Sequence, residues 1–234
     1  MTELIIIAGG VAGLTIWGCM MYQILPSGLP DVEDQEIEKD DTENSRKKRA
    51  GRVPLPRGYV YCIQIILNVA VAAMLALYYH RDSDDILLTV GTISFLWPCA
   101  YMDRRVQLIP NRILLYAIIV RAVWFAIEAF LFPGLIFIIL LSSVIAAFAL
   151  MAASLLCKVV SPGSVGMGDV KLLGVTGLFL AMDKVWGAVF AGLIIMFCVC
   201  VFLLVTKRAA RSSRIAFAPF LLAGTVLGAI LMGI

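Results

Sequence analysis

Charged residues are scarce in this chain: they make up 15% of its 234 residues, whereas 62% of the residues are hydrophobic. A soluble domain has roughly one quarter charged residues, so the composition excludes an ordinary soluble fold. Strictly alternating apolar patterns and repeats of fixed period are also missing, which excludes a closed barrel of short strands. We expect a protein surrounded by a lipid bilayer, with no nucleic-acid partner.

Long apolar segments indicate how often the chain crosses the membrane. A spanning helix needs about 20 mostly apolar residues. The expected fold class is all-α, a polytopic membrane bundle of about eight transmembrane helices. We expect a first transmembrane helix within 1–26, a charged cytoplasmic loop over 27–58 and a transmembrane core over 59–234. The seven long segments and a short eighth one are Leu4–Ile24, Tyr59–Tyr79, Ile86–Met102, Ile113–Phe132, Gly134–Cys157, Val185–Thr206, Ile215–Ile234 and the short Val170–Met182.

The basic residues predict the orientation. If all eight segments cross, sixteen of the nineteen Lys and Arg residues fall on one side, which the positive-inside rule makes cytoplasmic. Both termini would then lie outside a cytoplasmic (inner) membrane. Without Val170–Met182 as a crossing, the basic run at 207–214 would fall outside, so the rule predicts that this short segment crosses. Asp103 and Asp169 then both face the cytoplasmic end.

Segment length predicts the depth of Asp169. The 13 helical residues from Val170 to Met182 rise only about 20 Å, against about 30 Å of hydrocarbon. If Asp183 holds the outer end at the interface, Asp169 lies roughly 10 Å below the cytoplasmic surface. Burying an unpaired carboxylate is unfavourable, so Asp103 and Asp169 at apolar boundaries indicate a function.

The scarcity of histidine and the spacing of cysteine narrow the possible chemistry. The single histidine, His80, is predicted on the outer side, which leaves no histidine base near the two carboxylates. The six cysteines form no Cys-x-x-Cys pair and His-Glu-x-x-His is absent, so we expect neither a metal nor a cofactor. A Ser–Lys dyad of Ser161 or Ser164 with Lys171 stays open.

Two aspartates suffice for peptide-bond hydrolysis without a covalent intermediate. The ionised one takes a proton from water while the protonated one polarises the scissile carbonyl, and like charges at short range share one proton. Gly166 and Gly168 would permit positive φ and close approach of a substrate strand. Asp169 would open a helix, and Pro110 fits the first turn of another. Taken singly, Asp169 is more simply explained as a helix cap and Asp103 as an interfacial charge.

Together these segments resemble the type IV prepilin peptidase family, membrane aspartic proteases of the Gly-x-Gly-Asp class. Residues 100–103 (Ala-Tyr-Met-Asp) with 108–111 (Leu-Ile-Pro-Asn) are similar to its first catalytic block. Residues 166–174 (Gly-Met-Gly-Asp-Val-Lys-Leu-Leu-Gly) closely resemble the second. Residues 215–220 (Ile-Ala-Phe-Ala-Pro-Phe) look like its last helix, and 16–26 like the end of its first.

The resemblance implies an endopeptidase that removes a short basic leader from prepilin-like or pseudopilin precursors at the cytoplasmic membrane face. Asp103 and Asp169 would be the dyad, and Gly166, Gly168, Pro110, Asn111 and Lys171 would shape the site. Many members carry two Cys-x-x-Cys pairs after the first helix, bind zinc there and N-methylate the new terminus. Residues 27–58 contain no cysteine, so zinc and methylation are not expected here.

Two further charges, Arg121 and Glu128, lie seven residues apart within one apolar segment and therefore on one helix face. A structural ion pair and a functional role are both open for them. The competing hypothesis of another class is a transporter or non-catalytic assembly factor that uses these charges and the two aspartates as an ion path. Such a protein would show inverted repeats, which the sequence does not display.

Overall fold

The chain is all-helical where the structure describes it. The computed structural model describes residues 2–24, 58–80, 82–161, 165–206 and 215–233, so the predicted loop at 27–58 lies, except for Gly58, outside the described residues. The predicted fold class is confirmed. The helices in these ranges are α1 (Thr2–Ile24), α3 (Gly58–Leu77), α4 (Ser83–Val106), α5 (Asn111–Leu131), α6 (Ile136–Val160), α7 (Met167–Val205) and α8 (Ala218–Met232).

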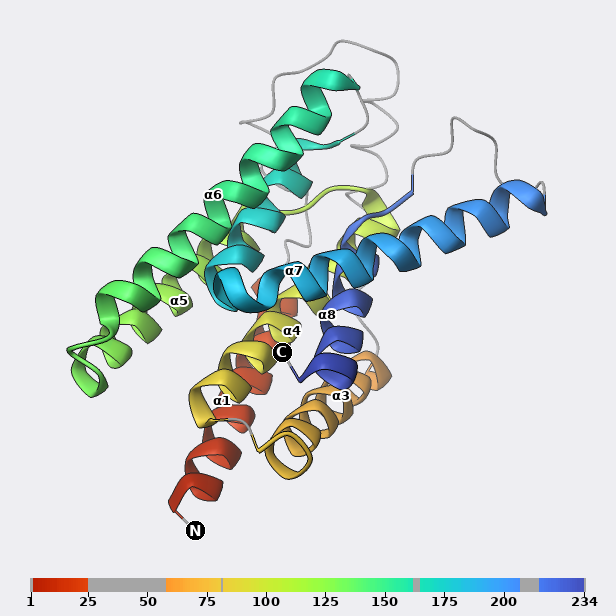
Figure 1. Ribbon diagram of the computed structural model, residues 1–234. Coiled ribbons are helices and arrows are strands. Elements are labelled where there is room, and N and C mark those ends of the chain that lie inside the picture. Colours follow the sequence, from red (N-terminus) through yellow and green to blue (C-terminus); the bar gives the residue numbers. More distant parts are fainter. Residues whose placement is uncertain (1, 25–57, 81, 162–164, 207–214, 234) are drawn as a thin grey trace.

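Helix α7 consists of two parts that meet at a break. Ala181 has φ 54° and ψ −175°, a conformation that is essentially restricted to glycine and interrupts the helical ladder. Figure 1 shows the change of direction there, where the teal first part gives way to the blue second part. The short helix expected after the Gly-x-Gly-Asp motif is thus present as Met167–Leu180, and it continues directly into the following segment.

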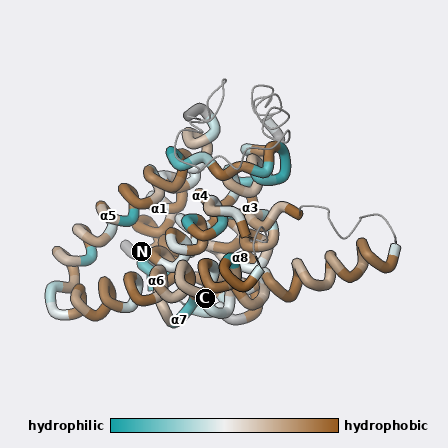
Figure 2. Tube along the Cα trace, turned by 90° about the horizontal axis from the view of Figure 1, so that it is seen from above, coloured by the Kyte–Doolittle hydropathy of each residue, from teal (hydrophilic) through white to brown (hydrophobic). Residues whose placement is uncertain are grey.

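The outer surface is suited to lipid. Six helices, α1 and α3 to α7, are long and apolar enough to cross a membrane. Figure 2 shows hydrophobic residues along most of the length of these helices. Phe130, Phe137 and Phe148 of α5 and α6 are among the large apolar side chains that are exposed on the isolated chain. Helix α8, with 15 residues, is shorter than the segment Ile215–Ile234 expected to span.

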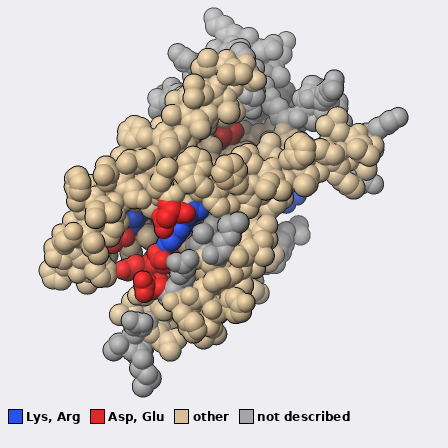
Figure 3. Space-filling view, viewed as in Figure 1, with Lys and Arg blue, Asp and Glu red and all other residues tan. Residues whose placement is uncertain are grey.

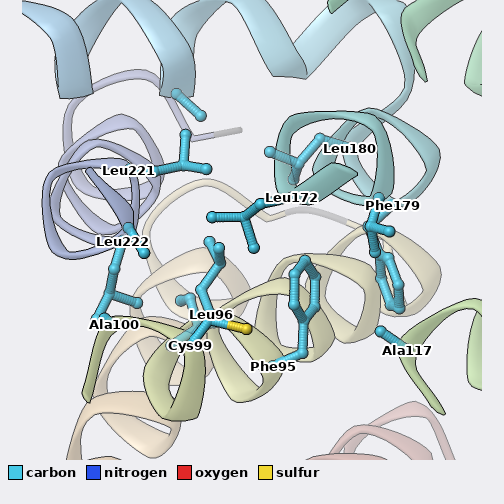
Figure 4. Close-up of a cluster of buried hydrophobic side chains, with 14 of the residues drawn as sticks. Phe95, Leu96, Cys99, Ala100, Ala117, Leu172, Phe179, Leu180, Leu221 and Leu222 are labelled. Carbon is cyan, nitrogen blue, oxygen red and sulfur yellow. The ribbon is translucent and has the colours of Figure 1, made fainter. Parts of the chain in front are cut away.

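Helix α4 lies at the centre of the bundle and packs against α1, α3, α5, α7 and α8. Of its most apolar window, 78% is buried, against 22% for α6, so α4 carries the protein core. Figure 4 shows Phe95, Leu96 and Cys99 of α4 meeting Leu172 of α7 and Leu221 of α8. This core joins the three helices that carry the sequence motifs.

Small residues set the closest helix contacts. A Cβ atom on Gly177 of α7 would lie 2.7 Å from the backbone nitrogen of Ala147 in α6. A Cβ atom on Gly224 of α8 would lie 2.3 Å from the backbone nitrogen of Gly192 in α7. Backbones approach this closely where glycine removes the side chain, which is how membrane helices gain packing contacts without a hydrophobic driving force between them. The positions of α7 and α8 are therefore fixed backbone against backbone.

Candidate active site

Asp103 is a buried carboxylate in the last turn of α4, with only 6% of its surface exposed. The backbone N–H of Ala218, at the start of α8, donates to its Oδ2 at 2.8 Å, and the N–H of Phe217 is a second donor. The first N–H groups of a helix have no partner inside the helix, and Pro219 marks this helix start. The start of α8 therefore holds the Asp103 carboxylate in one orientation.

Asp169 stands in the first turn of α7 and is half-buried. Its Oδ2 accepts a hydrogen bond of 3.3 Å from the backbone N–H of Gly166, the N-cap residue, as expected for a carboxylate that opens a helix. Asp103 and Asp169 lie within electrostatic range of each other. The structure thus brings together the two aspartates that the sequence singled out.

The loop after α4 joins the two motifs. Lys171 Nζ donates to Asn111 Oδ1 at 3.2 Å, which links the second turn of α7 to the first residue of α5. Gly168 is buried against Ile109: a Cβ atom on this glycine would lie 3.2 Å from the Ile109 Cβ. Pro110 directly precedes α5 as its N-cap residue, with φ −67°. Four segments, the end of α4 with its loop and the starts of α5, α7 and α8, therefore meet at one place.

The expectation about the two glycines needs correction. Gly166 has φ −74°, and among the described glycines only Gly233 has positive φ, so Gly166 and Gly168 do not use left-handed backbone. The absent side chain of Gly168 instead makes room for Ile109. Pro110 is the N-cap residue of α5, and its carbonyl accepts from the N–H of Ile113, so it begins the first turn of that helix.

The other candidate groups lie elsewhere or are engaged. His80 precedes α4, and Asp103 lies about 30 Å further along that helix. Ser164 is outside the described residues, and Lys171 donates to Asn111. Within the described part of the chain, no group of three or more His, Cys, Asp or Glu side chains could hold a metal ion.

Arg121 and Glu128 form a direct ion pair, with 2.9 Å between Arg121 Nη1 and Glu128 Oε1. Both side chains are almost fully buried. The pair lies beside Leu178 of α7, nine helical residues or about 13 Å from Asp169. Of the two roles left open by the sequence, the structural pairing is present.

Sequence reasoning missed the backbone donors of Phe217 and Ala218. Their segment was noted only as part of a helix, without a role at the site. The available signal was Pro219, which predicts a helix start and therefore unpaired N–H groups just before and at it. What they contact depends on the fold and could not be read from the sequence.

A sequence profile of the type IV leader peptidase family matches residues 90–233, which is more than half of the chain and includes both aspartates and α8. This chain belongs to the type IV leader peptidase family. No curated protein and no solved structure matches it. As a leader peptidase with several apolar spanning helices, it is a peptidase and a multi-pass membrane protein.

Proposed function

We propose that this leader peptidase is an aspartic endopeptidase with Asp103 and Asp169 as its catalytic dyad. The observation that carries the proposal is the meeting of these two carboxylates, 66 positions apart in sequence, at a site formed by four helix ends. All four helix ends lie within the stretch that matches the family. Helix capping needs no second carboxylate nearby, so capping alone does not explain why the two aspartates lie close together.

The reaction follows from the two carboxylates. One, ionised, takes a proton from a water molecule as the oxygen attacks the scissile carbonyl carbon. The other, protonated, donates a hydrogen bond to the carbonyl oxygen and stabilises the charge that develops there. The backbone N–H of Ala218 and that of Gly166 each hold one oxygen of a carboxylate, which keeps both groups oriented without a further side chain.

The substrates would be prepilin-like precursors cut between a short basic leader and the apolar pilin helix. Basic residues gather at the helix ends near the dyad: Arg104, Arg105 and Arg112 around the loop after α4, and Lys158 at the end of α6. The positive-inside rule assigns this end to the cytoplasm. A precursor helix in the bilayer would therefore present its leader at the face where Asp103 and Asp169 lie.

An ion path through the four intramembrane charges is less well supported. Arg121 and Glu128 neutralise each other in one cluster, and the two aspartates form another. The peptidase hypothesis uses the aspartates alone and gives the ion pair a separate role.

The test is cleavage of candidate precursors by the purified full-length protein and by Asp103→Asn and Asp169→Asn. Both variants should lose cleavage and still insert into the membrane at the parental level. Asp183→Asn is the matched control, since it makes the same change in the same helix as Asp169 at an exposed position, and it should cut normally. Full cleavage by either dyad variant contradicts the proposal. The mass of the product N-terminus, measured in the same assay with S-adenosylmethionine, should show no added methyl group.

A further inference from the structure

The break at Ala181 leaves backbone groups of α7 without their usual helical partners. In an unbroken helix the carbonyl of Leu178 would accept from the N–H of Met182. Here Arg121 Nε donates to the Leu178 carbonyl at 2.9 Å, and the Met182 N–H donates to Ser142 Oγ at 3.2 Å. Side chains from α5 and α6 thus replace the hydrogen bond that the break removes.

All three nitrogens of the Arg121 guanidinium donate hydrogen bonds that hold the side chain in this position. Nη1 pairs with Glu128, Nη2 donates to Ser143 Oγ at 3.4 Å, and Nε caps Leu178. The guanidinium carbon lies 3.8 Å from the centroid of the Phe125 ring. A fixed cation at the carbonyl end of a helix also complements the negative end of its dipole.

Charges from α4 and from the second part of α7 surround the same break. Asp84 lies within electrostatic range of both Arg121 and Glu128, and Lys184, just after the break, forms an ion pair with Asp85. Figure 3 shows acidic and basic side chains gathered over the turn of α7 on an otherwise largely uncharged face. The break is therefore held from three neighbouring helices.

We propose that Arg121 is a positioning residue: by capping Leu178 it fixes the C-terminal end of the short helix Met167–Leu180 and thereby places Asp169 close to Asp103. That helix is a rod of about 20 Å whose other end is seated on Ile109 and Asn111. If the C-terminal end shifts, the whole short helix shifts with it. The inference rests on the proposed function for the role of Asp169, and its first test below does not depend on catalysis.

The first test measures where the short helix sits. Ile109→Cys and Gly168→Cys, in a full-length protein whose native cysteines are replaced, should form a disulfide readily because their Cβ positions nearly touch. The test variant is Arg121→Met with Glu128→Leu, which leaves no unpaired buried charge and so is expected to fold. Its cross-linking rate should fall severalfold. An unchanged rate overturns the proposal.

The second test measures cleavage by the same variant with the cysteines at 109 and 168 restored to the native residues. A misplacement of about 1 Å at the dyad can reduce the rate about 100-fold, so kcat should fall by that order while KM for the precursor stays unchanged. Glu128→Gln keeps the guanidinium and an acceptor for it, and the Asp84 carboxylate stays within electrostatic range of the cation. This variant should retain both the cross-linking rate and kcat.

A positioning role and a purely structural role of Arg121 predict different cross-linking and cleavage rates for the membrane-inserted fraction of the double variant. If the double variant only accumulates less, and its inserted fraction cross-links and cuts like the parent, Arg121 is merely structural and the proposal is wrong. Equal loss in Glu128→Gln also contradicts it, since the Leu178 contact is intact there.

Ser142→Ala removes the partner of the Met182 N–H and should lower both the cross-linking rate and kcat, to a smaller extent than the double variant does. If every variant cross-links as expected and no precursor is cut by the parent, the positioning inference stands and the proposed function fails.

Discussion

The backbone N–H of Ala218 donates a 2.8 Å hydrogen bond to Oδ2 of Asp103, although the two residues are 115 positions apart. This contact makes the start of α8 part of the site. It exists only because α8 packs closely against α7 and α4. Changes in that packing should therefore reach the carboxylate from a distance.

Gly224→Ala should impair cleavage without touching the dyad. The added Cβ would lie 2.3 Å from the Gly192 nitrogen and 2.4 Å from the Ala188 carbonyl oxygen, and backbone atoms cannot move aside as flexible side chains do. We expect α8 to shift and the cleavage rate to fall about tenfold or more. Gly134→Ala is the control, because nothing lies within 4 Å of its Cβ position. Parental cleavage by Gly224→Ala would contradict the role given to α8.

Gly168→Ala should reduce cleavage through a clash with Ile109. The two Cβ atoms would stand 3.2 Å apart, so the start of α7 must move by a few tenths of an ångström. Adding Ile109→Gly to this variant removes the opposing Cβ atom and should recover much of the rate. Cleavage rates of the single and double variants measure this coupling. If the second change brings no recovery, the glycine is needed for another reason.

Ala181→Gly should stabilise the protein. A non-glycine residue in this backbone region is strained by about 1–3 kcal/mol, while glycine adds about 0.5–1 kcal/mol of conformational entropy cost. A net gain of about 1 kcal/mol is expected, visible as a higher unfolding midpoint in detergent. Ala181→Val should lower the midpoint, because a β-branched side chain fits this conformation worse. A lower midpoint for the glycine variant would show that the break is not strained.

Gln64→Leu should weaken the end of α4 that carries Asp103. Pro98 has no N–H, so the carbonyl of Ser94 lacks its helical partner, and Gln64 Nε2 of α3 donates to it at 3.5 Å. Loss of this bond leaves a buried carbonyl unpaired, at about 1–3 kcal/mol. The unfolding midpoint and the cleavage rate should both fall.

Gly18→Ala tests the same arrangement from α1. Its Cβ would lie 2.1 Å from Gln64 Nε2 and 3.0 Å from the Ser94 carbonyl, so it should displace the glutamine and reproduce the effect of Gln64→Leu. Gly9→Ala in the same helix has nothing within 4 Å and should behave like the parent. Equal behaviour of the two glycine variants would contradict this account.

The pairing of Asp103 with Asp169 as a catalytic dyad stays a prediction, whereas apolar runs, charge counting and motif spacing were enough to predict the all-α fold and the short helix after Gly168. These features are local or depend on composition, because a bilayer constrains segment length and the order of motifs along the chain is visible directly. The backbone of Gly166 was predicted wrongly, since a glycine permits positive φ without requiring it.

The sequence by itself determined that the chain forms a membrane helical bundle, and it named the residues that are candidates for the chemistry. Only the tertiary structure decided how the two aspartates are held: the N–H of Ala218 at Asp103, the seat of Gly168 on Ile109, and Arg121 at the break in α7. Each of these contacts joins segments far apart in sequence. Each either pairs a backbone N–H or C=O group with a side chain or lets two helices approach closely, and both require the packed helices. A local sequence pattern can predict that a helix end or a break in a helix leaves a backbone donor or acceptor unpaired. It does not predict which distant residue will pair with that group.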